Sequence, residues 1–176
     1  MAGMILTYMR TFKIGDQIKM NDVMGVVLEK TPFVTRIRTS KNEIVTVPNS
    51  TIMSAQTINY TASGERNGVI VHTDITVGYE VDREKVQALL LEAAMDTRGI
   101  NPFPRPFVLI TKLDDFYCVY QINGYTQETK TLPKVYSNLY GNIIDKFHEA
   151  GIEIMSPHFY ARRDGNEIMM PDKYKK

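Results

Sequence analysis

Few residues in the sequence have the type and spacing that catalysis or metal binding requires. The three histidines, His72, His148 and His158, fall in different predicted elements, and none forms the i, i+4 pair that binds zinc on a helix. The single cysteine, Cys118, alternates with aromatic residues on a predicted strand and has no basic neighbour to stabilise a thiolate. Asp114-Asp115 forms a two-residue turn, in which adjacent acids point in different directions. These residues favour structural roles over catalytic or metal-binding ones.

The sequence also lacks the short motifs of nucleotide binding and hydrolysis. It contains no GxxxxGK[ST] loop, no GxGxxG after a strand, no GxSxG elbow and no HExxH pair. We therefore expect no enzyme activity, no cofactor and no bound metal. The net charge of +1, from 21 basic and 20 acidic residues, gives no overall electrostatic reason to bind nucleic acid. RNA binding is kept as an alternative because four basic residues gather in the first half: Lys30, Arg36, Arg38 and Lys41.

Hydropathy predicts no membrane-spanning helix. Such a helix needs about 20 consecutive apolar residues, and the most apolar stretches, Gly68–Gly78 and Ala88–Met95, are shorter and contain charged residues. Residues 1–10 form an apolar stub, which is a short capping strand, the end of a longer helix or a foreign extension, and composition alone does not choose among these. A single cysteine excludes an internal disulfide and favours a reducing compartment.

Residues 11–63 have the pattern of a small all-β domain. Pro48-Asn49-Ser50 follows the fourth β-rich run and predicts a single helical turn, capped by Asn49 or Ser50. Five short strands in so few residues predict a strongly bent sheet or a barrel, since closure removes exposed edges. The predicted strands lie within Gln17–Met20, Met24–Thr31, Phe33–Thr39, Ile44–Val47 and Gln56–Thr61.

Residues 64–163 change to a β-α-β-β-α-β pattern after the loop-rich segment Ser63–Gly68. This order predicts a ferredoxin-like α+β domain, an antiparallel sheet with both helices on one face. The expected elements are a strand over Val69–Tyr79, a helix capped by Asp82 that ends near Gly99, hairpin strands Pro106–Leu113 and Phe116–Tyr125, a helix from Pro133 to Gly151, and a strand within Ile152–Ala161. Residues 164–176 are left as a polar C-terminal tail.

Several motifs, in order, resemble the small-conductance mechanosensitive channel family. In the first half they are FKIGDQI at 12–18, GVV at 25–27, TRIRT at 35–39, VTVPNS at 45–50 and INY at 58–60. In the second half they are VGYEVD at 77–82, PRPFV at 104–108 and GIEI at 151–154. The resemblance covers residues 11–164. It departs from the family at Met155-Ser156, which separates the last motif from Pro157.

The resemblance implies a fold and a function. The fold would be an Sm-like barrel followed by a ferredoxin-like domain, in the family region that begins just after the pore helix. The chain would then be the cytoplasmic vestibule domain of a channel subunit at the inner membrane, with residues 1–10 as the end of the pore helix. Seven copies would form a ring-shaped chamber that filters ions and osmolytes, without enzyme activity or nucleic acid.

The family motifs also imply structural positions: Gly15, Asp16, Gly25, Pro48, Asn49 and Asn59. Gly15 and Gly25 would allow turns or bends that a Cβ hinders. Asp16 would bond nearby backbone in an Asx-type turn, and Pro48 would close a strand before Asn49, which tolerates left-handed geometry.

Overall fold

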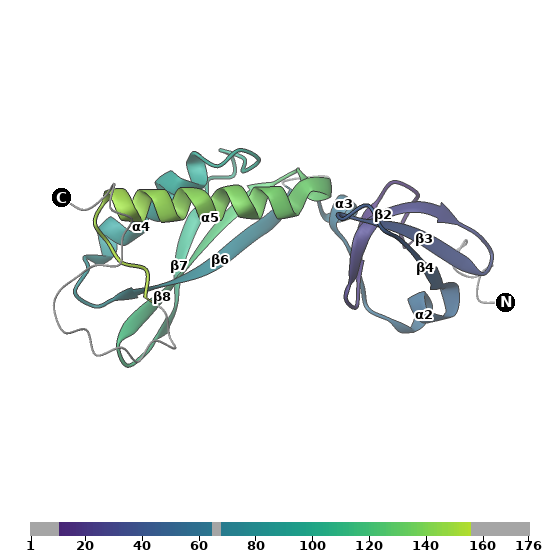
Figure 1. Ribbon diagram of the computed structural model, residues 1–176, viewed down its shortest axis with the longest axis horizontal. Coiled ribbons are helices and arrows are strands. Elements are labelled where there is room, and N and C mark those ends of the chain that lie inside the picture. Colours follow the sequence, from purple (N-terminus) through teal and green to yellow (C-terminus); the bar gives the residue numbers. More distant parts are fainter. Residues whose placement is uncertain (1–10, 65–67, 156–176) are drawn as a thin grey trace. The chain divides into compact units, whose positions relative to one another are not determined.

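The computed structural model describes residues 11–64 and 68–155, which divide into two compact units (Figure 1). The first unit contains the chain up to Val69 together with Thr126–Pro133, and the second contains Ile70–Tyr125 and the chain from Lys134. The predicted segments 1–10 and 164–176 lie outside the described residues.

The first unit is an antiparallel sheet of five strands in the order β4-β3-β2-β1-β5. The strands are β1 (Gln17–Met20), β2 (Val23–Lys30), β3 (Val34–Thr39), β4 (Ile44–Pro48) and β5 (Thr57–Asn59). Asn21 and Asn42, both with positive φ, occupy the turns between β1 and β2 and between β3 and β4. Asparagine tolerates this geometry better than most side chains, and the tight turns follow from it.

Alternating side chains of these strands form the core of the first unit. Its buried apolar residues are Phe12, Ile18, Met20, Val27, Ile37, Val47 and Ile52. Full burial of each such side chain contributes about 1.5–3 kcal/mol. Ile52 comes from α2 (Asn49–Ser54), the short helix after β4, and Phe12 precedes the first strand.

For the first unit, the all-β expectation holds at the level of a sheet, and one predicted strand limit needs correction. Among the described residues no strand pairing joins β4 to β5, so the structure is a five-stranded sheet whose closure into a barrel is not seen. The strand predicted over Gln56–Thr61 ends at Asn59, where α3 (Tyr60–Gly64) begins. The cause is the Asn59 side chain, whose Oδ1 accepts a hydrogen bond from the Ala62 amide at 3.0 Å, as a helix cap does.

The second unit combines a three-stranded sheet, in the order β6-β8-β7, with two helices. The strands are β6 (Val69–Gly78), β7 (Phe107–Leu113) and β8 (Tyr117–Thr126), and the helices are α4 (Arg83–Met95) and α5 (Leu132–Glu149). Alternation buries Val71, Ile75 and Val77 of β6. On β8 the same alternation buries Cys118, Tyr120 and Ile122. The predicted position of Cys118 on the apolar face of a strand is therefore confirmed.

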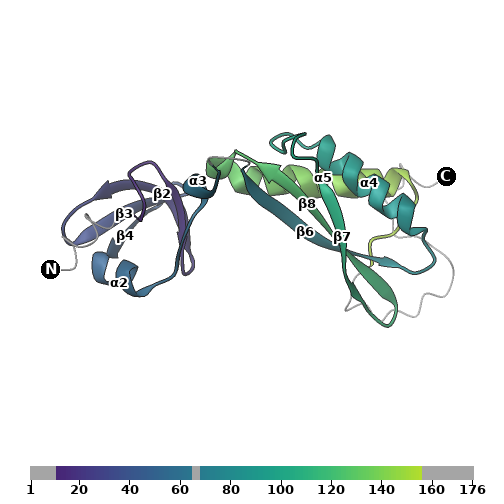
Figure 2. The ribbon, with the colours of Figure 1, turned by 180° about the vertical axis from the view of Figure 1, so that it is seen from behind.

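The predicted helix limits of the second unit are confirmed in part. Asp82 caps α4, its Oδ1 accepting from the Glu84 amide, but α4 ends at Met95, before the predicted Gly99. Thr97 accounts for the earlier end, because its hydroxyl donates to the Ala93 carbonyl at 2.6 Å. The helices lie side by side (Figure 2), joined by an ion pair of 2.8 Å between Lys146 Nζ and Asp96 Oδ2.

The predicted hairpin is confirmed, since β7 and β8 pair antiparallel from Phe107 opposite Asn123 to Leu113 opposite Cys118. The last predicted strand, within Ile152–Ala161, is described only to Met155 and has no strand geometry there. Met155 nevertheless lies beside β6: its amide donates to the Thr76 carbonyl at 2.9 Å, and the Thr76 hydroxyl donates to the Met155 carbonyl.

Candidate functional site

Three of the family-motif residues, Gly15, Asp16 and Asn59, meet at the turn before β1. Gly15 has φ +93°, the left-handed region that favours glycine. The Asp16 carboxylate accepts two hydrogen bonds at 2.8 Å, from the Lys13 amide and from Asn59 Nδ2. The Asp16 side chain therefore bonds back to the backbone three residues earlier, rather than forward as in an Asx turn, and at the same time joins this turn to the end of β5.

Gly25 lies on β2, where a side chain would collide with β3. A Cβ built on Gly25 would stand 2.7 Å from the carbonyl carbon of Arg38 and 2.9 Å from the Ile37 side chain. Backbone atoms of a paired strand have little room to retreat, so the two strands require glycine at this position.

Asn49 has a different role from the cap that the sequence predicts. Pro48 is the N-cap residue of α2 and makes no side-chain cap bond, and Asn49 does not have positive φ. The Asn49 side chain is only 3% exposed and turns into the unit. Its Oδ1 accepts from the Thr35 hydroxyl at 2.9 Å, and its Nδ2 donates to the Thr31 carbonyl at 2.8 Å. The residue thus joins α2 to β3 and to the turn before β3.

The sequence analysis missed Thr35, the buried partner of Asn49. Thr35 precedes Ile37 by two positions, so both side chains share the inner face of β3. A hydroxyl on the core face of a strand requires a hydrogen-bond partner. The alternation of β3 thus predicts that Thr35 is buried and that a second buried polar side chain lies within hydrogen-bond distance of it.

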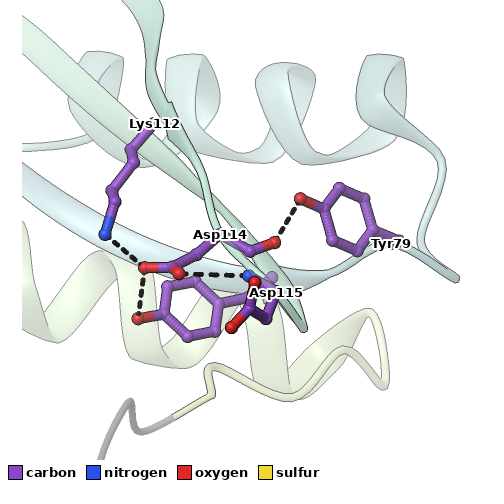
Figure 3. A network of polar contacts seen from close by, with 5 residues as sticks. Tyr79, Lys112, Asp114 and Asp115 are labelled. Carbon is purple, nitrogen blue, oxygen red and sulfur yellow. Dashed lines mark hydrogen bonds and ion pairs between the residues drawn. The ribbon is translucent and has the colours of Figure 1, made fainter.

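The turn of the β7–β8 hairpin carries a second polar network (Figure 3). Asp114 Oδ2 accepts from Lys112 Nζ at 2.5 Å and from the Tyr117 hydroxyl at 3.1 Å. The Asp115 amide donates to Asp114 Oδ1 at 3.0 Å, and the Tyr79 hydroxyl donates to the Asp114 carbonyl at 2.6 Å. Asp114 therefore fixes the turn to itself and to the residue just after β6.

This network shifts the protonation of its members. The hydrogen bond from Lys112 and the Asp115 amide hold the pKa of Asp114 below its ordinary value, and the same carboxylate raises the pKa of Lys112. Desolvation and the bond to Asp114 raise the pKa of Tyr117. All these groups exchange hydrogen bonds within the hairpin, which fits a structural network.

Large apolar side chains are concentrated on the same hairpin in contact with solvent. Leu113 is 68% exposed and Phe116 is 75% exposed, and three further side chains of β7 are exposed: Phe107, Leu109 and Ile110. β7 is also an edge strand of the described sheet. Exposed apolar groups at a strand edge are typical of a surface that another chain covers.

The side chains that could ligate a metal are dispersed in the described part of the chain. No group of three or more His, Cys, Asp or Glu side chains in it could hold a metal ion. His72 is exposed on β6 and His148 lies near the end of α5, while His158 falls outside the described residues. Within the same residues, no helix is both long and apolar enough to cross a bilayer.

Two family models match the chain in order along its length. The beta-domain of mechanosensitive ion channels matches residues 1–62, and the C-terminal domain of the mechanosensitive ion channel MscS matches residues 71–154. These matches fall on the residues that carry the motifs of both halves.

Curated relatives and solved structures agree with these matches. The chain is 24% identical over 161 residues to the miniconductance mechanosensitive channel MscM of Escherichia coli, covering 92% of this chain and 14% of that protein. It is 32% identical over 101 residues to the small-conductance mechanosensitive channel of Edwardsiella ictaluri, covering 57% of this chain and 34% of that protein. The chain thus spans about a third of one of these relatives and about a seventh of the other.

Among solved structures, Helicobacter pylori MscS in the closed state superposes with a TM-score of 0.73 at 23% identity, covering 88% of this chain and 60% of that one. An Arabidopsis structure, AtMSL1, gives a TM-score of 0.64 at 16% identity, covering 88% of this chain and 55% of that one. At these identities the likeness shows the fold. Together with the two matched domains, it shows that the chain belongs to the MscS family of mechanosensitive ion channels.

Proposed function

We propose that this chain is the vestibule portion of a mechanosensitive channel subunit, placed at the cytoplasmic face of the membrane. Seven copies form a ring-shaped chamber, and ions and small osmolytes cross its wall before they reach the pore. Residues 1–10 are the end of the pore helix, residues 11–63 a small Sm-like barrel and residues 64–163 a ferredoxin-like wall domain, followed by the tail 164–176. The observation that carries this proposal is the ordered match of both channel domains.

The exposed apolar side chains of the β7–β8 hairpin support assembly. A monomer would leave Leu113 and Phe116 in water together with the free edge of β7. Covering them with a neighbouring subunit removes apolar area from water and hides the strand edge. The partner in this proposal is a second copy of the same chain.

The nucleic-acid alternative gains no support from the residues that suggested it. Lys30 donates to the Phe12 carbonyl at 3.1 Å, and Arg36 forms an ion pair of 2.8 Å with Glu29. Two of the four basic residues are therefore engaged within the first unit, and both curated relatives named above carry the name of a mechanosensitive channel.

The test is channel function in cells. The full-length subunit that carries this chain is expressed in bacteria without their own mechanosensitive channels, and survival of a sudden drop in osmolarity is counted. We expect rescue by the intact subunit and loss of rescue when residues 11–155 are deleted, with surface expression checked in both. Absence of pressure-activated current in membrane patches from expressing cells would contradict the proposal.

A further inference from the structure

The backbone just before β1 is held by side chains from elsewhere in the first unit. Asn59 Nδ2 lies 3.5 Å from the Thr11 carbonyl, Lys30 Nζ donates to the Phe12 carbonyl at 3.1 Å, and the Lys13 amide donates to Asp16. Three successive residues thus have a side-chain partner, from β5, from β2 and from the following turn. Two of these contacts use a charge: the Lys30 ammonium on the Phe12 carbonyl and the Asp16 carboxylate on the Lys13 amide.

The Lys30 ammonium makes two interactions with Phe12, one with its ring and one with its backbone. Its Nζ lies 4.5 Å from the centroid of the Phe12 ring and also donates to the carbonyl of the same residue. A cation over an aromatic face and a charged donor on a carbonyl are each stronger than their neutral counterparts. The Phe12 side chain is itself 2% exposed within the core, so the ammonium fixes both the ring and the backbone of a core residue.

Removing this ammonium from water has a cost, which the site partly offsets. Burial lowers the pKa of Lys30, and the negative charge of Asp16 acts in the opposite direction. Asp16 is the residue that also holds Lys13 and Asn59. The lysine, the aspartate and the asparagine therefore act on the same three-residue segment.

We propose that Lys30 is a positioning residue that clamps residues 11–13 to the end of β2, so that a displacement of the chain before Thr11 moves the sheet. Without the clamp, the turn at residues 13–15 would absorb part of that displacement. The mechanical meaning rests on the proposed function, in which the pore helix precedes this segment. The clamp itself depends only on contacts within the first unit.

The clamp is tested on the chain itself by limited trypsin digestion. The readout is the cleavage rate at Lys13–Ile14, divided by the rate at Lys41–Asn42 in the exposed β3–β4 turn. Lys30→Met keeps the apolar stem and removes the charge, Lys30→Arg keeps a charged donor, and Lys19→Met is the control at an exposed lysine of β1. We expect Lys30→Met to raise the ratio on the order of tenfold, and Lys30→Arg and Lys19→Met to stay near wild type.

Two outcomes would overturn the clamp: an unchanged ratio in Lys30→Met, or a ratio in Lys30→Arg as high as in Lys30→Met. If Lys30→Met does not fold by circular dichroism, Lys30→Gln replaces it, since glutamine keeps a donor and loses the charge. A wild-type ratio in folded Lys30→Gln would then equally contradict the charge-dependent clamp.

The mechanical consequence is tested in the full-length subunit by the membrane tension at half-maximal opening. We expect Lys30→Met to shift this tension relative to wild type and Lys30→Arg to restore it. A faster cleavage in Lys30→Met with unchanged tension would overturn the coupling and leave the clamp. Absence of current in wild type would instead contradict the proposed function, whatever the digestion shows.

Discussion

At the residue scale, the family-motif positions of the first unit have physical roles that need no ligand. Asp16 and Asn59 bond each other at 2.8 Å, and Asn49 bonds Thr35 and the Thr31 carbonyl. Each of these side chains joins two segments that lie apart in the sequence. They stabilise the shape of the first unit.

Gly25 gives the first prediction at this scale. In Gly25→Ala the new Cβ would stand 2.7 Å from the carbonyl carbon of Arg38. We therefore expect the free energy of unfolding to fall by more than about 1 kcal/mol. The control is Gly141→Ala on the exposed side of α5, where a Cβ meets no atom within 4 Å. That change should stabilise by about 0.5–1 kcal/mol. Urea denaturation measures both, and equal effects of the two substitutions would contradict the steric account.

Asn49 gives the second. Asn49→Ala leaves the Thr35 hydroxyl and the Thr31 carbonyl without this partner in a buried site, so we expect a loss of about 2–3 kcal/mol. Ser50→Ala, at the exposed next residue of the same helix, should change stability by less than about 0.5 kcal/mol. Thermal melting of both variants checks this, and a small effect of Asn49→Ala would show that the buried bonds contribute little.

At the element scale, alternation and capping predict strands and helices well where local signals act alone. The buried positions of β6, Val71, Ile75 and Val77, follow from the period of two, and Asp82 marks the start of α4. The sequence failed where a side chain acts outside its own element. Asn59 ends β5 by capping α3, and Asn49 bonds Thr35 in place of its own helix.

Contacts between segments far apart in the sequence could not be predicted from the local hydropathy pattern either. Thr126–Pro133 begins with the last residue of β8 but belongs to the first compact unit, whereas the rest of β8 belongs to the second. No periodicity within so short a segment indicates which unit it joins. Lys30 is a similar case, because a lysine at a strand end is usually solvated, and only the position of the Phe12 ring reveals its contact.

The hairpin network gives a pH prediction at this scale. The folded pKa of Asp114 lies below its ordinary 3.8. Its contribution to the stability of the hairpin is therefore present above pH 3.8 and is lost as pH falls through the lower, folded value. The folded pKa of Lys112 lies above its ordinary 10.5. Its contribution to the stability of the hairpin is therefore present below pH 10.5 and is lost as pH rises through the higher, folded value. Protection of the Asp115 amide from hydrogen exchange, corrected for the intrinsic rate, should be highest between these limits.

Asp114→Asn is the matched variant for this titration, because it keeps the size of the side chain and removes the charge. We expect it to abolish the acid limb of the protection profile. Asp115→Asn, at the neighbouring carboxylate, should retain that limb. An acid limb of equal size in Asp114→Asn would assign the titration to another group.

At the scale of the whole molecule, the near-neutral charge predicts weak ion selectivity. The chain carries 21 basic and 20 acidic residues, and the proposed wall domain mixes both signs. A chamber focuses an electric field only when one sign dominates its walls, and at physiological salt the screening length is about 8 Å. Reversal potentials of the full-length channel in a salt gradient should therefore lie close to zero. A strong cation or anion preference that disappears on neutralising charges of residues 64–163 would contradict this expectation.

Assembly into a ring is the central claim of the proposed function, and the mass of the intact assembly tests it most directly. The full-length subunit is extracted in mild detergent, and its mass is measured by native mass spectrometry over a range of protein concentrations. The proposal predicts one dominant species of seven subunits that persists on dilution. A stable dimer or trimer as the dominant species would contradict it.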